Sequence, residues 1–195
     1  MFEQRHGYTP TQRIGQNFHL TIKMIRTFSE NIVFFDTEFS DLDSETGKLL
    51  SIGMVRPDGE ELYLEIEYEV EPNDWFKENV VPFLKGKKVS EEEARDKIRS
   101  FLGDTSPYLL SYVNQFDAIY WYKLFGARTH PAAKIPLDFS SMLFTLGFNP
   151  GSLSNDDFLD DLGIDASKYQ KHNALDDAKL LKEVYVKFFK RYGNY

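Results

Sequence analysis

The chain has 195 residues, 42% of them apolar, and a formal net charge of −8. This size and apolar share predict one folded domain with a hydrophobic core. The sequence contains no cysteine, which excludes disulfides, thiolate zinc sites and a cysteine nucleophile and leads us to expect a cytoplasmic protein. No apolar run approaches the roughly 20 residues that span a bilayer, so we expect no membrane partner.

The first 30 residues are locally basic. Their cations include Arg5, Arg13, Lys23 and Arg26. We interpret residues 1–30 as a basic N-terminal extension without fixed structure, which is either a loose leader or a basic arm for nucleic acid. Residues 31–195 then form the single domain.

A short apolar run opens this domain. Residues 32–35 are four consecutive apolar residues bounded by polar ones, a pattern typical of a short buried strand. A second strand is predicted at residues 49–55. Residues 62–70 alternate between apolar and polar side chains, which indicates a half-buried strand. The turn signal Asp58-Gly59 between these two strands predicts an antiparallel hairpin.

The remaining elements are mostly helices. Ser90, followed by Glu93 at the third helical position, has the pattern of a capping box at the start of a helix. Asn114 is expected to cap a helix that ends at Gly126. The other predicted elements are a short helix at residues 75–84, strands at 107–113 and 135–139, short helices at 140–146 and 156–162, and a final helix at 173–191.

This order of elements predicts the fold class. Strands joined by a hairpin run antiparallel, whereas strand–helix–strand units run parallel with right-handed crossovers. We therefore expect an α/β fold with a mixed central sheet and helices on both of its faces.

Two acids, Asp36 and Glu38, directly follow the first apolar run. Side chains two residues apart on a strand share one face, and their Cα atoms lie roughly 6.6 Å apart. Like charges that close repel each other, and a bound divalent cation would neutralise them. Asp-x-Glu alone also fits an ordinary acidic turn, so the rest of the sequence has to decide between the two interpretations.

A third acid, Asp117, lies in the first turn of the helix that begins after Asn114. An acid at this place interacts favourably with the helix dipole, which would explain it without any chemistry. Its helical face continues with Trp121 and Leu124, however, so we expect the carboxylate to point inward.

The last helix offers two neighbouring acids, and helical periodicity separates them. Asp177 shares its stripe with the apolar Leu181, Val184 and Phe188, whereas the stripe of Asp176 is mostly polar. Asp176 also lies three residues after the expected cap Asn173. We therefore predict that Asp177 takes part in the chemistry, that Asp176 belongs to the cap, and that His172 stands at the edge of the site.

Three motifs in this order resemble those of a known family. They are Asp36-Thr37-Glu38-Phe39, Asn114-Gln115-Phe116-Asp117 and His172-Asn173-Ala174-Leu175-Asp176-Asp177. The chain resembles the DEDD 3′–5′ exonucleases of the RNase H-like fold. A histidine five residues before the last acid is typical of the DnaQ-like (DEDDh) branch, since the tyrosine-containing branch would have Tyr where Asn173 stands.

Within this family the chain looks most like small stand-alone bacterial and phage 3′–5′ exoribonucleases. The similarity includes the segment Leu50-Ser51-Ile52-Gly53-Met54-Val55 and the segment Val81-Pro82-Phe83-Leu84. One departure is that a single residue separates Asn114 from Phe116-Asp117, where many relatives have two. This departure puts a substrate role for Asn114 in doubt. It does not affect the role expected for Asp117.

The resemblance implies a metal-dependent 3′–5′ exoribonuclease that releases 5′-mononucleotides from single-stranded RNA. Two Mg²⁺ or Mn²⁺ ions suit a site of carboxylates without thiolates. The expected metal ligands are Asp36, Glu38, Asp117 and Asp177. His172 would be the general base, since a pKa near 6.5 suits proton transfer at neutral pH. The expected substrate contacts are Thr37, Phe39, Asn114 and His172.

Several alternatives remain open at this point. The substrate could be DNA, as for repair or proofreading exonucleases, and the chain could be a non-catalytic RNase H-like binding module. A phosphatase with an Asp-x-Asp nucleophile would leave the later motifs unexplained. The resemblance also suggests a homodimer, for which Tyr185, Phe189 and Tyr192 provide an apolar stripe on the last helix, although the same stripe would equally suit a helix covered on two sides.

Overall fold

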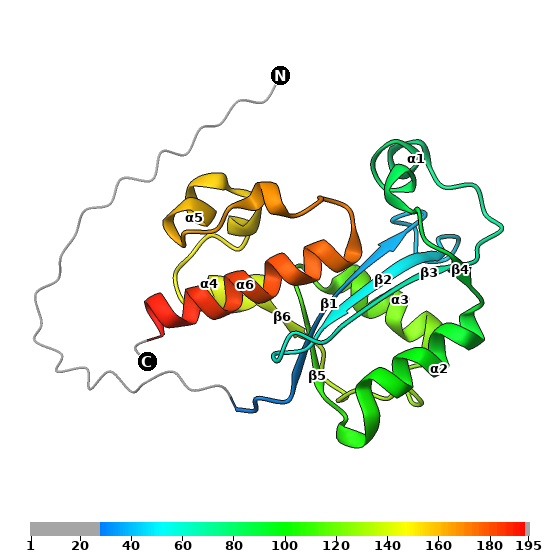
Figure 1. The fold of residues 1–195 in the computed structure, drawn as a ribbon, viewed down its shortest axis with the longest axis horizontal. Coiled ribbons are helices and arrows are strands. Elements are labelled where there is room, and N and C mark those ends of the chain that lie inside the picture. The colour runs from blue at the N-terminus through cyan, green and yellow to red at the C-terminus, as the bar shows by residue number, and fades with distance from the viewer. Residues whose placement is uncertain (1–27, 194–195) are drawn as a thin grey trace, which may run out of the picture.

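The computed structural model describes residues 28–193 and is built around one six-stranded sheet (Figure 1). The strands are β1 (Ile32–Phe39), β2 (Leu49–Val55), β3 (Glu61–Ile66), β4 (Lys88–Val89), β5 (Tyr108–Ser111) and β6 (Leu137–Asp138), in the spatial order β4-β3-β2-β1-β5-β6. The pairs β1–β2 and β2–β3 are antiparallel, whereas β1–β5, β5–β6 and β3–β4 are parallel. The predicted mixed sheet with its antiparallel hairpin is therefore confirmed.

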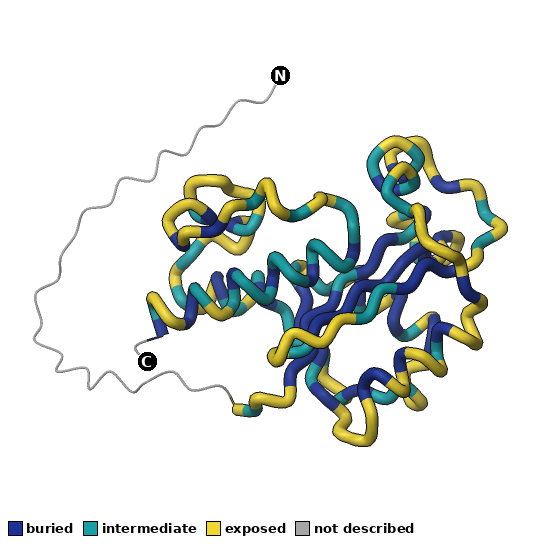
Figure 2. The backbone as a smooth tube through the Cα atoms, viewed as in Figure 1, coloured by how far each residue is buried: buried dark blue, intermediate teal, exposed yellow. Residues whose placement is uncertain are grey.

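Helices cover both faces of this sheet, as predicted (Figure 1). They are α1 (Asp74–Asn79), α2 (Glu91–Leu102), α3 (Gln115–Phe125), α4 (Phe139–Thr145), α5 (Asp156–Asp161) and α6 (Ala174–Tyr192). Helices α2 and α3 pack on one face, and α4, α5 and α6 pack on the other. Figure 2 shows the consequence, in that the strands are buried between helices whose outer surfaces are exposed.

The central strand β1 is buried from both sides, so its side chains alternate between the two cores. Val33 and Phe35 belong to the core under α2 and α3, and Ile32 and Phe34 belong to the core under α6. The alternation continues along the strand. It places Asp36 and Glu38 on the side of α6, with Thr37 on the opposite side.

Glycine at position 53 allows α6 to approach the sheet closely. Gly53 pairs with Asp36 across β1 and β2. A Cβ atom added to Gly53 would lie 2.3 Å from the backbone of Ala174 and Leu175 in the first turn of α6. Any side chain at this position would push the helix away. Glycine, which has no side chain, therefore allows the start of α6 to lie next to Asp36.

Several predicted elements are confirmed. Strand β2 has the predicted bounds, and α6 begins after Asn173, whose Oδ1 accepts a hydrogen bond of 3.2 Å from the Asp176 amide. Ser90 caps α2 by accepting from the Glu93 amide at 3.2 Å. The predicted inward stripe of α3 is also observed, because Trp121 and its stripe neighbours are buried.

The half-buried strand predicted at residues 62–70 is wrong in two respects. Strand β3 ends at Ile66, where it pairs with β4, and the chain then departs toward α1. Glu65 was expected on the solvent-exposed face of the strand but is only 2% exposed. Its Oε1 accepts hydrogen bonds from the Gly86 amide at 2.7 Å and from the Tyr63 hydroxyl at 3.1 Å. These contacts compensate for the burial of Oε1, whereas Oε2 is buried without a hydrogen bond from the described residues.

Three smaller expectations also need correction. The predicted helix at residues 75–84 is α1 followed by a separate 3-10 turn that contains Pro82. The strand predicted at 135–139 is reduced to β6, because Phe139 already begins α4. Asn114 occupies the position before α3, but its side chain makes no capping hydrogen bond.

The apolar stripe proposed for a dimer packs largely within the chain. Phe189 is buried, and the ring of Tyr185 lies 5.3 Å from that of Phe34. The ring of Tyr192 lies 5.1 Å from that of Phe188. The stripe therefore contributes to a helix that is covered on two sides, and the homodimer stays a prediction.

The structure tests the N-terminal extension and the expected location of the protein only in part. The predicted basic extension lies almost entirely outside the described residues. Between residues 28 and 193, no helix is long and apolar enough to cross a membrane, while the cytoplasmic location stays a prediction.

Candidate active site

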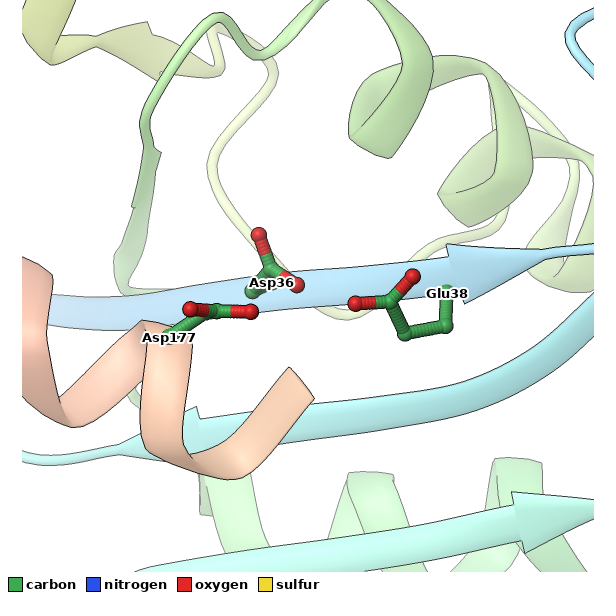
Figure 3. A group of neighbouring side chains, drawn as sticks. All are labelled: Asp36, Glu38 and Asp177. Atoms are coloured by element: carbon green, nitrogen blue, oxygen red, sulfur yellow. The ribbon is translucent and has the colours of Figure 1, made fainter. Parts of the chain in front are cut away.

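The first two acids of the candidate site come from β1. Asp36 and Glu38 project from the same face of the strand toward the start of α6 (Figure 3). Glu38 is 6% exposed. The strand thus brings one buried carboxylate, Glu38, and one half-buried carboxylate, Asp36, to the candidate site.

The third acid, Asp117, is tied to the opposite side of the same strand. Strand β5 stops pairing with β1 after the contact between Phe34 and Leu110. Farther along β1, Asp117 Oδ1 accepts hydrogen bonds from the Thr37 amide at 2.9 Å and from the Thr37 hydroxyl at 2.6 Å. The carboxylate thus accepts from a backbone amide of β1 that β5 leaves unpaired. Asp117 is 5% exposed, in agreement with the inward orientation predicted from its helical face.

The fourth acid, Asp177, lies in the first turn of α6. Its Oδ2 accepts a hydrogen bond of 2.9 Å from the backbone amide of His172. His172 itself adopts a left-handed conformation with φ of 62°. Side-chain-bearing residues rarely adopt this conformation, so the turn before α6 is shaped to bring its amide to the carboxylate.

The neighbouring Asp176 points elsewhere. Its Oδ2 accepts from the Gln170 amide at 3.0 Å, and its Oδ1 lies 3.8 Å from Lys179 Nζ. It therefore serves the loop and the surface of α6. The distinction between Asp176 and Asp177 that periodicity predicted agrees with these contacts.

The acids meet in one cavity. Carboxylate oxygens of Asp36, Glu38 and Asp177 all lie within 4.8 Å of one another, and Figure 3 shows the three side chains facing a common point between β1 and α6. Asp117 borders the same cavity, whose volume is about 280 Å³. Its lining residues are Asp36, Thr37, Glu38, Phe39, Leu42, Trp75, Phe76, Tyr112, Val113, Phe116, Asp117, His172 and Asp177.

Burial and mutual repulsion raise the pKa of each of the two β1 acids. Burial contributes most to the raised pKa of Asp36, followed by the charges of Asp117, Asp177 and Glu38. Burial, Asp177 and Asp117 raise the pKa of Glu38 to about 8. Neither carboxylate has a cationic partner in the described part of the chain that offsets these effects.

The two helix acids are perturbed less because hydrogen bonds partly compensate for their burial. Burial raises the pKa of Asp117 to about 6, against the lowering effect of the bonds from Thr37. Burial also raises the pKa of Asp177 to about 7, against the bond from the His172 amide. The bonds favour the charged form, as expected for a carboxylate that accepts N–H groups.

This set of residues fits a divalent cation. Four carboxylates that repel one another in a buried cavity are stabilised once a cation binds between them, and an all-oxygen donor set suits Mg²⁺ or Mn²⁺. Asp36, Glu38 and Asp177 are close enough to share one ion, and Asp117 lies beside them. An acidic cluster of this kind is consistent with the use of divalent metal.

His172 borders the cavity and is held by an aromatic neighbour. Burial, and then the positive charge of Lys171, lower the pKa of His172 below its ordinary value of 6.5. The Trp75 ring lies 5.1 Å from the imidazole at an angle of 84°. The imidazole is therefore neutral near pH 7 and can accept a proton.

The predicted substrate contacts occupy different positions. Thr37 is buried and uses both its amide and its hydroxyl to hold Asp117. Phe39 lines the cavity and stacks on Tyr120 with ring centres 4.6 Å apart. Asn114 does not line the cavity, so the doubt raised by its spacing persists, and its substrate role stays a prediction.

Sequence reasoning missed the apolar rim of the site. Trp75 on α1 is 49% exposed, and Val113 is 41% exposed, although both line the cavity. Leu42, after β1, is 57% exposed and lies there too. No local pattern predicts that α1 folds over the acids. The one available signal is a Trp in a short polar helix, because exposed apolar side chains often mark a binding site.

A larger cavity lies elsewhere and offers different chemistry. Its volume is about 510 Å³, and apolar residues such as Phe28, Ile135 and Met142 line it. It contains neither a carboxylate nor a histidine. The smaller acidic cavity is therefore the candidate active site.

Comparison with solved structures supports the fold. E. coli exonuclease I in complex with a dT13 oligonucleotide superposes with a TM-score of 0.61 at 16% identity, covering 83% of this chain and 41% of that chain. The zinc-bound form of the exonuclease I–ssDNA complex gives 0.61 at 17% identity, covering 82% and 40%. This chain spans about two fifths of the length of those proteins. The RNase H-like fold predicted from the motifs is confirmed.

No protein-family model matches the sequence, and no curated protein matches it significantly. At identities of 15 to 17%, the structural similarity concerns the fold.

Proposed function

We propose that this protein is a metal-dependent 3′–5′ exonuclease that acts on the ends of single-stranded RNA and releases 5′-mononucleotides. The observation that carries the proposal is the convergence of four acids and one histidine on a cavity of about 280 Å³. A cavity of this size, at the lower limit of ordinary ligand sites, suits a single terminal nucleotide.

The metal ligands in this proposal are Asp36, Glu38, Asp117 and Asp177, which would hold two Mg²⁺ or Mn²⁺ ions. Bound divalent ions supply an activated water and neutralise charge at the scissile phosphate. The contribution of the chain is to hold four carboxylates ready for them. Thr37 fixes Asp117, and the His172 amide fixes Asp177.

His172 is the proposed general base. Its lowered pKa keeps the imidazole neutral near pH 7, which is the form that accepts a proton from water. The edge-on contact with Trp75 restricts the orientation of the imidazole at the border of the cavity. The position beside Asp177 brings this base next to the proposed metal ligands.

The apolar rim would receive the sugar and base of the terminal nucleotide. Trp75 and Phe39 offer aromatic surface at the cavity. Stacking of a base on an aromatic ring is worth roughly 1–3 kcal/mol and tolerates any base. Such binding fits an exonuclease without strong sequence preference.

The choice between RNA and DNA rests on the motifs and on the charge of the chain. The likeness of the motifs to small exoribonucleases and the acidic balance of the chain favour a short single-stranded RNA end. The solved complexes of similar fold contain single-stranded DNA, which favours DNA as the second candidate. A contact to the terminal 2′-OH would distinguish them, and one such hydrogen bond predicts a preference of about three- to tenfold.

The direct test uses 5′-end-labelled single-stranded oligonucleotides with Mg²⁺ or Mn²⁺. We expect stepwise shortening from a free 3′-OH and release of 5′-mononucleotides, with no cleavage of a circular strand. The Asp177→Asn variant should be inactive in the same assay. A wild-type protein that binds the oligonucleotide but never shortens it would instead indicate a non-catalytic binding module.

Matched RNA and DNA oligonucleotides test the substrate preference. We expect kcat/KM to be higher for RNA by about three- to tenfold. Equal values, or faster cleavage of DNA, would favour a repair or proofreading exonuclease and leave the 3′–5′ activity itself in place.

A further inference from the structure

Asp138 lies outside the acidic cavity, at the junction of β6 and α4, and connects two segments of the chain. Its Oδ1 accepts hydrogen bonds from the amides of Val113 at 3.0 Å and Asn114 at 3.4 Å. It also caps α4, accepting from the Ser140 amide at 3.2 Å and the Ser141 amide at 3.1 Å. Figure 1 shows β5 and β6, the strands that lead into these two segments, side by side.

The carboxylate of Asp138 remains charged in this position. Burial alone would raise its pKa, but the hydrogen bonds from the hydroxyls and amides of Ser140 and Ser141 outweigh burial and lower it. The two hydroxyl contacts are short, at 2.6 Å and 2.5 Å. A charged acceptor makes stronger hydrogen bonds than a neutral one, so Asp138 is a firm anchor for the amide of Val113.

Val113 needs such an anchor because its backbone is left-handed. Its φ is 57°, which is unusual for any residue with a side chain and especially for a β-branched one. The Val113 side chain is 41% exposed and lines the acidic cavity. An unfavourable backbone conformation that presents an apolar side chain to a cavity indicates a function for that side chain.

Asp117, four residues later, does not depend on the same anchor. Thr37 holds its carboxylate through two hydrogen bonds of 2.9 Å and 2.6 Å. The turn between β5 and α3 therefore has two separate attachments. Thr37 fixes the acid, and Asp138 fixes the wall of the cavity formed by Val113.

We propose that Asp138 is a positioning residue for substrate binding, because it holds Val113 in the conformation in which its isopropyl group packs against the sugar or base of the terminal nucleotide. This inference rests on the proposed exonuclease function. It assigns Asp138 to the affinity for the nucleotide and leaves the metal ligands and the general base unaffected.

The Asp138→Ala variant tests the proposal through the separation of KM from kcat. We expect KM for a single-stranded oligonucleotide to rise about three- to tenfold, as for the loss of an apolar contact of roughly one buried methylene group, while kcat stays within about twofold. Mn²⁺ binding measured by calorimetry should be unchanged, because Thr37 still holds Asp117. The Thr145→Ala variant removes a side-chain hydrogen bond within α4 that does not involve Asp138 and should leave KM unchanged.

A second variant keeps the test valid if Asp138→Ala folds poorly. Val113→Gly removes the side chain and accepts a left-handed backbone without strain. We expect it to raise KM to a similar extent while its melting temperature equals or exceeds that of the wild type. The double variant should have the same KM as either single variant, because both changes act through one contact.

The outcomes separate this inference from the proposed function. An active wild type whose Asp138→Ala and Val113→Gly variants keep the wild-type KM would overturn the role of Asp138 and leave the exonuclease activity in place. A fall in kcat at constant KM would indicate a structural role only. A wild type that fails to shorten any oligonucleotide would overturn both proposals.

Discussion

Asp117 and Asp177 lie in the first turns of two different helices, yet the protein holds them in different ways. Asp117 accepts two hydrogen bonds from Thr37, one from the amide and one from the hydroxyl. Asp177 accepts a single bond from the amide of His172, a residue with left-handed backbone. Burial raises the pKa of Asp117 to about 6 and that of Asp177 to about 7.

The difference shows that separate parts of the fold hold the two sides of the candidate site in place. The α3 side is anchored to the central strand of the sheet, which is buried on both faces. The α6 side depends on the turn before the helix and on the close approach that Gly53 allows. We therefore expect changes on the α6 side to affect catalysis most, and changes on the α3 side to affect both stability and activity.

The largest effect is expected for the Asp177→Asn variant. Loss of a metal ligand should abolish hydrolysis, because several kcal/mol of transition-state charge stabilisation disappear. Its melting temperature without metal should equal or exceed that of the wild type, since a neutral side chain relieves repulsion. The matched Asp176→Asn variant should remain active in the oligonucleotide assay, and the assignment of roles would be reversed if Asp176 proved to be the essential one.

Replacement of His172 comes next. His172→Ala and His172→Gly should both slow the chemical step by roughly 10²–10⁴-fold, the usual range for a general base. The glycine variant should be the more stable of the two by about 1 kcal/mol, because glycine accepts the left-handed backbone. Single-turnover kinetics and thermal melts measure the two effects. A loss of Mn²⁺ binding by calorimetry in the glycine variant would instead make His172 a ligand.

A smaller effect is expected on the α3 side. Thr37→Val removes the hydroxyl that donates to Asp117 but keeps the amide donor. A hydrogen bond to a charged group is worth about 1.5–3 kcal/mol, so stability should fall by an amount in this range at pH 8. Activity should fall by about tenfold as Asp117 becomes less well oriented. Urea titration and initial rates measure both, and an unchanged rate would show that the amide alone positions Asp117.

Local patterns predicted the parts of the site that depend on single elements. Helical periodicity distinguished Asp177 from Asp176, and the spacing on the strand placed Asp36 beside Glu38. The capping role of Asn173 was likewise predicted from its own helix. In each case the deciding neighbours lie in the same helix or strand, and the tertiary structure reinforces them.

Long-range contacts decided the parts that could not be predicted. Glu65 is buried where the Gly86 amide, 21 residues later, donates a hydrogen bond to its carboxylate. The side chain of Asn114 makes no capping hydrogen bond, while its own amide and that of Val113 donate to Asp138, which lies 24 and 25 residues later. Trp75 reaches His172 only because α1 packs over the end of the sheet against Leu50. No periodic pattern in the sequence predicts these contacts, because they join residues that are far apart along the chain.

The central claim is that four acids, two buried and two half-buried, form a cation site and that their charges oppose folding without the cation. Burial and the charges of Asp177 and Asp117 raise the pKa of Glu38 from its ordinary value of 4.5 to about 8 in the folded protein. The folded state therefore binds this proton more tightly than the unfolded state, so the contribution of Glu38 to stability is present at low pH and is lost as pH rises toward 8. A bound cation should reverse this loss.

The most direct measurement compares the melting temperatures of the wild type and the Glu38→Gln variant between pH 5 and pH 9, in chelator and with Mn²⁺. The two proteins differ only at Glu38, so the difference between their melting temperatures reports the titration of Glu38 together with its repulsion of Asp36. In chelator the wild type should match the variant near pH 5 and become progressively less stable than the variant up to about pH 8, and Mn²⁺ should stabilise the wild type more than the variant. Parallel pH profiles in chelator, with no stabilisation by Mn²⁺, would contradict the cation site.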